Sequence, residues 1–159
     1  LMNAFRNLFR RNKNLKLICV GGGYYLSDIK RMALEYNLGK AVIFTGYSRY
    51  VVEYLSLMDV FVLCSLKEGF PNVLLQAMAM SLPVVSANVG GCSEIIDHMK
   101  NGILYPSNDV GRFIEAIERL KTDTAFARRL RSNAKRTVEE NFSLNRMIKE
   151  YTSYYTELS

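Results

Sequence analysis

The alternation of short apolar runs with segments of helical periodicity is the feature that most limits how this chain can fold. β-Branched and aliphatic residues gather in five short runs, at residues 15–20, 42–45, 60–63, 84–87 and 102–105. Runs of this length and composition are typical of strands buried on both faces of a sheet. Helical spacing marks the segments between them, at residues 27–36, 51–58, 72–80 and 93–97. This order predicts an α/β fold, a Rossmann-like, doubly wound parallel sheet with three α/β/α layers.

Helices are also predicted at both ends of the chain, at residues 2–11, 109–120, 124–141 and 143–157. Asp109, Asp123 and Ser143 stand where the N-caps of the last three are expected. A right-handed βα unit normally begins with a strand, whereas this chain begins with a helix. We therefore expect the first strand to be absent from the sequence, leaving either a five-stranded sheet or a strand contributed by a partner. No repeat or linker divides residues 1–159, so one domain is expected.

Composition indicates a globular domain and narrows its partners. Apolar residues make up 49% of the chain and charged residues 23%, with a net charge of +6. The basic residues near the N-terminus are interpreted as a solvated helix face, and no nucleic-acid-binding motif accompanies them. The sequence shows no transmembrane run or signal peptide, so a cytoplasmic protein is expected. The three cysteines form no zinc or disulfide pattern, and Cys19 and Cys64, which lie in or beside apolar runs, are expected to be buried.

The run SLKEGFPN, residues 65–72, follows the third predicted strand and leads into an apolar helix. In an open α/β sheet, ligands bind beyond the carboxyl ends of the strands. Gly69 allows the backbone to come close to a ligand, and Pro71 suits the first helical turn. The free amides of the first turn and the helix dipole then favour a phosphate, although a tight loop that starts a core helix explains the same glycine and proline.

Two polar residues in the apolar helix strengthen the ligand hypothesis. Asn72 and Gln76 are four residues apart and so share one helix face, in a stretch that is otherwise apolar. Buried polar side chains need partners, and a ligand with hydroxyl groups or a backbone carbonyl would serve.

The run EGFPNVLLQAMAMSLPVVSANVGGCSEII, residues 68–96, resembles the donor-binding core of family-4 retaining glycosyltransferases of the GT-B fold. Their hallmark is a glutamate, seven residues and a second glutamate, followed by a Gly-Gly loop. Residues 17–23 resemble the family's strand and glycine loop, and residues 42–46 its VxFxG segment. The resemblance therefore identifies residues 1–159 as a nucleotide-sugar donor-binding domain, with the N-terminal acceptor domain outside the sequence.

The resemblance also implies roles for single residues. Glu68 would be catalytic and face the donor sugar, and position 76, here Gln76, would bind the ribose. Backbone amides in the loop and first helical turn would hold the sugar and diphosphate, at Gly69, Phe70, Asn72, Val73 and Leu74. The base and the far wall of the site would be contacted by Tyr47, Ser48, Gly90 and Gly91.

Two residues depart from the family pattern. Gln76 stands where the family has glutamate, so a charged acceptor of hydrogen bonds becomes a neutral one. Ser81 stands where the pattern usually has glycine, and a left-handed backbone there would cost a serine on the order of 1 kcal/mol. The family's basic diphosphate clamp belongs to the first βα unit, which we expect to precede Leu1.

By resemblance, the full enzyme transfers a sugar from UDP-sugar or GDP-sugar to a glycan or lipid-linked sugar, in polysaccharide or glycolipid synthesis. No metal cofactor is expected, and a peripheral contact with the inner face of the membrane is left open. The isolated domain should be inactive. The alternatives are a nucleotide-sugar epimerase of the same fold and a catalytically degenerate binding module.

Two further patterns carry less weight. The Gly21-Gly22-Gly23 loop lacks the third glycine of a dinucleotide fingerprint, since position 26 is Leu26, which argues against a dehydrogenase. His98 has no partner typical of a catalytic base and is expected to be a loop residue.

Overall fold

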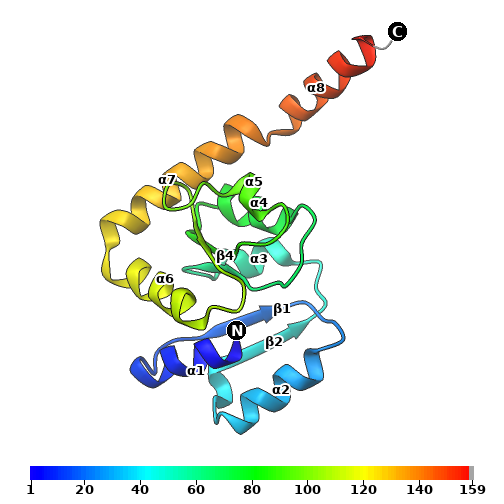
Figure 1. The fold of residues 1–159 in the computed structure, drawn as a ribbon. Coiled ribbons are helices and arrows are strands. Elements are labelled where there is room, and N and C mark those ends of the chain that lie inside the picture. Colours follow the sequence, from blue (N-terminus) through cyan, green and yellow to red (C-terminus); the bar gives the residue numbers. More distant parts are fainter. Residues whose placement is uncertain (158–159) are drawn as a thin grey trace.

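The computed structural model describes residues 1–157, whose strands form two parallel sheets (Figure 1). The first sheet pairs β1 (Leu17–Val20) with β2 (Val42–Gly46). The second has the order β3 (Phe61–Leu63), β4 (Val84–Ala87) and β5 (Ile103–Tyr105). All five predicted strands are therefore present, and every pairing is parallel, as the alternating pattern required.

The helices also match the prediction, with ends that differ by no more than two residues. They are α1 (Met2–Arg11), α2 (Leu26–Glu35), α3 (Val51–Ser56), α4 (Asn72–Ala79), α5 (Cys92–Ile95), α6 (Val110–Thr122), α7 (Thr124–Asn141) and α8 (Leu144–Glu157), with a short 3-10 turn η1 (Gly39–Ala41). The predicted N-caps are confirmed. Asp109 and Asp123 each accept a bond from a first-turn amide at 2.9 Å, and the Ser143 hydroxyl accepts one at 3.3 Å.

The expectation of one five-stranded sheet is wrong for the described residues, because β1 and β3 are not hydrogen-bonded to each other. We call the boundary between the β1–β2 sheet and the β3–β4–β5 sheet the seam. Helix α1 packs on both sides of it. Met2 and Phe5 lie in a cluster with β1 and β2, whereas Ala4 and Leu8 lie in a cluster with β4, β5 and α6. One amphipathic helix thus joins the two sheets through side-chain packing, without closing the ladder between them.

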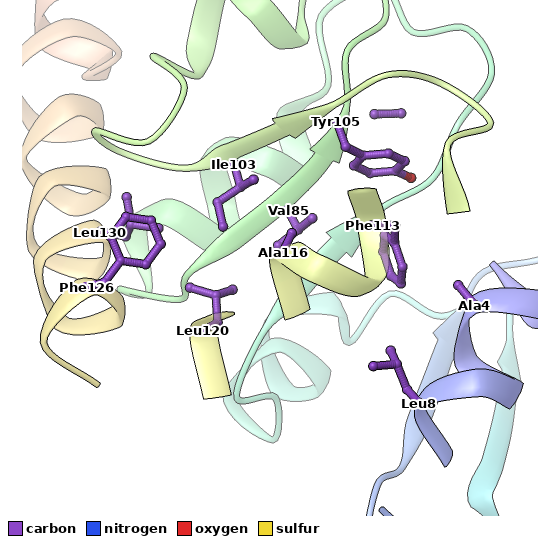
Figure 2. Close-up of a cluster of buried hydrophobic side chains, with 11 residues drawn as sticks. Ala4, Leu8, Val85, Ile103, Tyr105, Phe113, Ala116, Leu120, Phe126 and Leu130 are labelled. Carbon is purple, nitrogen blue, oxygen red and sulfur yellow. The ribbon is translucent and has the colours of Figure 1, made fainter. Parts of the chain in front are cut away.

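The helices cover both faces of the sheets, which confirms the three-layer fold. Figure 2 shows the core on one face, where Phe113 of α6 lies between Tyr105 of β5 and the side chains of α1. The rings of Tyr105 and Phe113 make an edge contact at 5.3 Å. On the other face, α3, α4 and α5 pack with α7 in a second cluster that contains the fully buried Leu74, Met78 and Ala134.

The end of α4 explains the unusual backbone at Ser81. Its φ is +59°, the left-handed conformation expected from the family's glycine at this position. The amide of Leu82 donates to the carbonyl of Ala77 at 3.0 Å, and the amide of Ser81 donates to that of Met78 at 2.9 Å. These are the two bonds of a Schellman cap, which stops α4 and turns the chain into β4.

Helix α8 extends away from the body of the domain (Figure 1). Its exposed apolar and aromatic residues recur at helical spacing, at Leu144, Met147, Ile148, Tyr151, Tyr154 and Tyr155. No helix within residues 1–157 is long and apolar enough to cross a membrane.

Candidate functional site

Because all strand pairings are parallel, the carboxyl ends of the strands lie at the same edge within each sheet. Tyr105, at the end of β5, and Cys64, which follows β3, interact through their side chains, and burial together with this interaction raises the pKa of Tyr105. Burial raises the pKa of both Cys64 and Cys19, and the charge of the Cys64 thiolate raises the pKa of Cys19 further. Both thiols are partly buried, and the fully buried cysteine is Cys92.

The loop after β3 is held in place by the Gly90-Gly91 turn. The amide of Gly91 donates to the carbonyl of Gly69 at 2.8 Å. A Cβ atom at Gly90 would lie 1.8 Å from the carbonyl oxygen of Glu68, and one at Gly91 would lie 2.3 Å from that of Gly69. Only glycines permit this contact between two backbones. The structure thus brings together two parts of the motif predicted from the sequence, the loop at residues 68–69 and the Gly90-Gly91 turn.

Helix α4 begins where this loop ends. Pro71 occupies the N-cap position, one residue before the first turn in which we predicted it. The amides of Asn72 and Val73 make no hydrogen bond within the described residues, so they remain available to an anion. Leu74 corrects the prediction, because its amide already donates to the carbonyl of Pro71 at 2.9 Å and its side chain is fully buried. Leu74 therefore supports the site through its packing in the core, and its backbone amide is not available to a ligand.

Three polar side chains around this helix start have no protein partner among residues 1–157, those of Glu68, Asn72 and Gln76. Glu68 is half-buried, whereas Asn72 and Gln76 are exposed, on the face of α4 that their spacing predicted. The expectation that these two are buried is therefore wrong. No part of residues 1–157 covers their face of α4. The side-chain amides of Asn72 and Gln76 and the carboxylate of Glu68 are therefore free to bind one polar ligand.

The remaining predicted residues lie farther out. Tyr47 is 91% exposed, and Ser48 uses its hydroxyl to accept a bond from the amide of Tyr50 at 3.1 Å, which shapes the loop after β2. The ring of Phe70 packs against Phe142 at 5.9 Å, so it faces the junction of α7 and α8 and only its backbone borders the site.

The sequence that forms this glycine-clamped loop, free helix start and uncovered polar face matches a known family model over residues 1–137, described as glycosyl transferases group 1. The chain belongs to this family. Its fold is that of the C-terminal domains of GT-B glycosyltransferases, as the sequence motifs indicated.

Relatives of this glycosyltransferase domain are longer proteins. It is 33% identical to N-acetyl-alpha-D-glucosaminyl L-malate synthase of Bacillus anthracis over 144 residues, which cover 90% of this chain and 38% of that protein. It is 28% identical to UDP-Gal:alpha-D-GlcNAc-diphosphoundecaprenol alpha-1,3-galactosyltransferase of Escherichia coli, covering 89% and 36% of the two. The crystal structure of Anabaena Alr3699/HepE in complex with UDP superposes with a TM-score of 0.91 at 21% identity, covering 99% of this chain and 44% of that one. The chain thus spans less than half the length of these proteins.

Two features of this glycosyltransferase domain lie outside the predicted site. His98 is a loop residue, as predicted, and its Nδ1 accepts a bond from the amide of Leu104 at 3.1 Å. A hollow of about 660 Å³ between α5 and the α7–α8 junction is lined by residues that include Glu94, His98 and Arg146, but by none of the predicted donor residues.

Sequence reasoning missed one feature of the edge, the tyrosine pair Tyr24 and Tyr25 in the loop after β1. Their side chains are 91% and 66% exposed, and their rings meet edge to face at 5.2 Å. The signal was present, since two large aromatic residues directly after a glycine loop have no place in the strand or helix pattern.

Proposed function

We propose that this chain is the donor-binding half of a retaining glycosyltransferase that uses UDP-sugar or GDP-sugar. The observation that carries the proposal is the unpartnered set of Glu68, Asn72 and Gln76, held at a free helix start by the Gly90-Gly91 turn. In the reaction, the bond between the sugar C1 and the diphosphate oxygen breaks, and a bond from C1 to the acceptor oxygen forms. The acceptor proton leaves with the diphosphate. The acceptor is a glycan or a lipid-linked sugar.

Each part of the site has one task in this proposal. The carboxylate of Glu68 accepts hydrogen bonds from the donor sugar and positions it. The amides of Asn72 and Val73, with the dipole of α4, stabilise the charge that develops on the diphosphate. Gln76 binds the ribose, and the loop at Tyr47 and Ser48 lies beside the base. Gly69 and Phe70 contribute backbone next to the sugar.

Donor binding in this proposal needs no metal cofactor, since the resemblance assigns the remaining diphosphate contacts to the basic clamp of the first βα unit. The Anabaena neighbour in complex with UDP and the Escherichia coli relative named for a UDP-Gal donor support this class of donor. The lipid-linked acceptor in that relative's name fits a cytoplasmic enzyme with a peripheral membrane contact. Because the acceptor domain completes the site, the isolated domain would bind the donor weakly and would not transfer the sugar.

The test is a pair of titrations by calorimetry, UDP against UDP-glucose and GDP against GDP-mannose, with backbone amide shifts from NMR to map the site. We expect shifts at Gly69, Asn72, Val73 and Gln76. Glu68→Gln should remove the part of the affinity that the sugar adds, about ten-fold or more for a lost charged hydrogen bond, and leave that of the free nucleotide unchanged. Glu35→Gln, at the exposed end of α2, is the control. Shifts confined to α6, α7 and α8 would refute the assignment.

A degenerate nucleotide-sugar-binding module is the second candidate, and the neutral Gln76 is the observation that favours it. The full-length enzyme separates the two. Sugar transfer by the protein as it stands supports an enzyme, whereas transfer only after Gln76→Glu supports a module that has lost catalysis. The epimerase alternative predicts release of an epimerised sugar without any acceptor, which the same assay would detect.

A further inference from the structure

Phe70, near the end of the loop after β3, is anchored by a contact outside the predicted site. Its side chain is 46% exposed, and its ring meets that of Phe142 at a centroid distance of 5.9 Å, with an angle of 52° between the ring planes. This distance lies within the range of favourable aromatic pairs. Phe142 stands at the end of α7, so the contact ties the loop to a helix that is not part of the donor motif.

Phe142 has a fixed place in the fold. It is the C-cap of α7, where its amide donates to the carbonyl of Val138 at 2.9 Å. Its half-buried side chain packs against the core cluster that contains the fully buried Leu74 and Ala134. The ring that Phe70 contacts is therefore attached to the same core that supports α4.

The start of α8 holds the backbone on both sides of Phe142. The guanidinium group of Arg146 donates to the carbonyl of Glu140 at 3.3 Å and to Oδ1 of Asn141 at 3.0 Å. The hydroxyl of Ser143 accepts a bond from the amide of Arg146 at 3.3 Å. These bonds join the last residues of α7 to the first turn of α8, so both helices fix the backbone that carries the Phe142 ring.

Two contacts from different parts of the chain thus hold three consecutive residues of the loop. The Gly90-Gly91 turn packs against the backbone of Glu68 and Gly69, and Phe142 packs against the ring of Phe70. The carboxylate of Glu68 has no protein partner among residues 1–157, so its position depends on the backbone that carries it. A loop that is already ordered binds more tightly, because fewer residues lose freedom on binding.

We propose that Phe142 is a positioning residue for Glu68, which acts by packing against Phe70 and so fixes the loop that places the carboxylate beside the donor sugar. The inference rests on the proposed function and adds to it a residue from the end of α7. It predicts an effect on the sugar part of the donor alone. The amides of Asn72 and Val73, which would hold the diphosphate, belong to α4 and do not depend on the Phe70 ring.

The test compares the donor affinities of full-length variants by calorimetry. UDP-glucose and GDP-mannose are titrated beside free UDP and GDP, so that the gain in affinity from the sugar is measured separately. Phe142→Ala should reduce this gain about two- to ten-fold, the range expected for one lost aromatic contact, and leave the Kd of the free nucleotide unchanged. Phe142→Tyr keeps the ring and should restore most of the gain.

Two further variants separate positioning from a general loss of stability. Phe70→Ala removes the other ring of the pair from an exposed position and should reduce the gain by the same factor. The double variant should lose no more than either single one, because both rings act through one contact. Val138→Ala is the matched control, since Val138 packs in the same core cluster from the preceding turn of α7. It should lower stability and leave the gain from the sugar unchanged.

Hydrogen exchange measured by NMR provides a readout that needs no ligand. The amide of Gly91 donates to the carbonyl of Gly69 at 2.8 Å, so its exchange rate reports how often the loop moves away from the turn. Phe142→Ala should speed this exchange by about two- to ten-fold, in line with the lost contact. The amide of Ile96, which donates to the carbonyl of Cys92 at 2.9 Å, should exchange at an unchanged rate.

Unchanged exchange at Gly91 in Phe142→Ala, or an unchanged gain from the sugar, would overturn the inference. An equal loss in Val138→Ala would also overturn it, since the role of Phe142 would then be structural only. Losses that multiply in the double variant would show that the two rings act independently, which contradicts the inference as well. A wild-type enzyme that binds neither nucleotide sugar would instead refute the proposed function, and exchange at Gly91 would still decide whether Phe142 holds the loop.

Discussion

Substitution of Gly90 by alanine tests the backbone contact on which the site depends. The new Cβ would lie 1.8 Å from the carbonyl oxygen of Glu68 and 2.8 Å from its carbonyl carbon. Both are backbone atoms, so no side chain can rotate away and the loop after β3 must move. We expect an overpacking cost of about 1–3 kcal/mol, added to about 1–2 kcal/mol for a left-handed alanine at φ +48°.

Gly39→Ala is a matched control because it isolates the steric part. Gly39 has nearly the same φ, +49°, but a Cβ atom added there would have no heavy atom within 4 Å beyond its chain neighbours. The left-handed strain and the lower entropy of the unfolded chain are common to the two substitutions and cancel in their difference. The remaining difference of about 1–3 kcal/mol corresponds to a Tm gap of roughly 2–12 °C for a domain of this size.

Urea unfolding and calorimetric melting measure this gap, and titration with UDP-glucose measures its effect on the site. Gly90→Ala should weaken donor binding because it displaces Glu68, whereas Gly39→Ala should leave the Kd unchanged. Equal losses of stability in the two variants, with equal affinity for the donor, would show that the Gly90-Gly91 turn does not position this loop.

Three further outcomes are expected. Ser81→Gly should raise the free energy of unfolding by up to about 1 kcal/mol in urea unfolding, since glycine adopts φ +59° without strain; an unchanged midpoint would argue against the left-handed cap. Gln76→Glu should tighten the binding of UDP in calorimetry and do nothing for its 2′,3′-dideoxy analogue, whereas equal gains would exclude ribose contact. Burial raises the pKa of Cys19 and Cys64 above 9.0, so the folded state retains their protons and stability should fall as pH rises through and above 9. Replacing both thiols by alanine should flatten that slope in unfolding curves measured between pH 8 and 10.

The sequence predicted the features that depend on local chemistry. Strand and helix positions followed from apolar periodicity, and the left-handed backbone at Ser81 followed from the glycine usual at that position. Glu68, Asn72 and Gln76 were recognised from motif spacing, and the structure leaves all three without a protein partner among residues 1–157.

Features that depend on contacts between residues far apart in the sequence could not be predicted from local patterns. That the Gly90-Gly91 turn rests on the backbone of residues 68 and 69 is a tertiary contact, which no local pattern reveals. The amide of Leu74 was expected to be free, but the carbonyl of Pro71 reaches it because the first turn of α4 is tight. Asn72 and Gln76 were expected to be buried because their neighbours are apolar, yet nothing within residues 1–157 covers their face of the helix.

The seam has a consequence for how the domain opens. Within residues 1–157, no backbone hydrogen bond joins the β1–β2 sheet to the β3–β4–β5 sheet, and α1 holds the two together by side-chain packing. Cooperative units of a protein commonly coincide with such hydrogen-bonded blocks. In a protein that consists of residues 1–159 alone, residues 17–46 therefore form a block that can detach while the ladder of β3, β4 and β5 stays intact. Amide protons in β1 and β2 should exchange through this partial opening, ahead of those in β4, which exchange only when the whole domain unfolds.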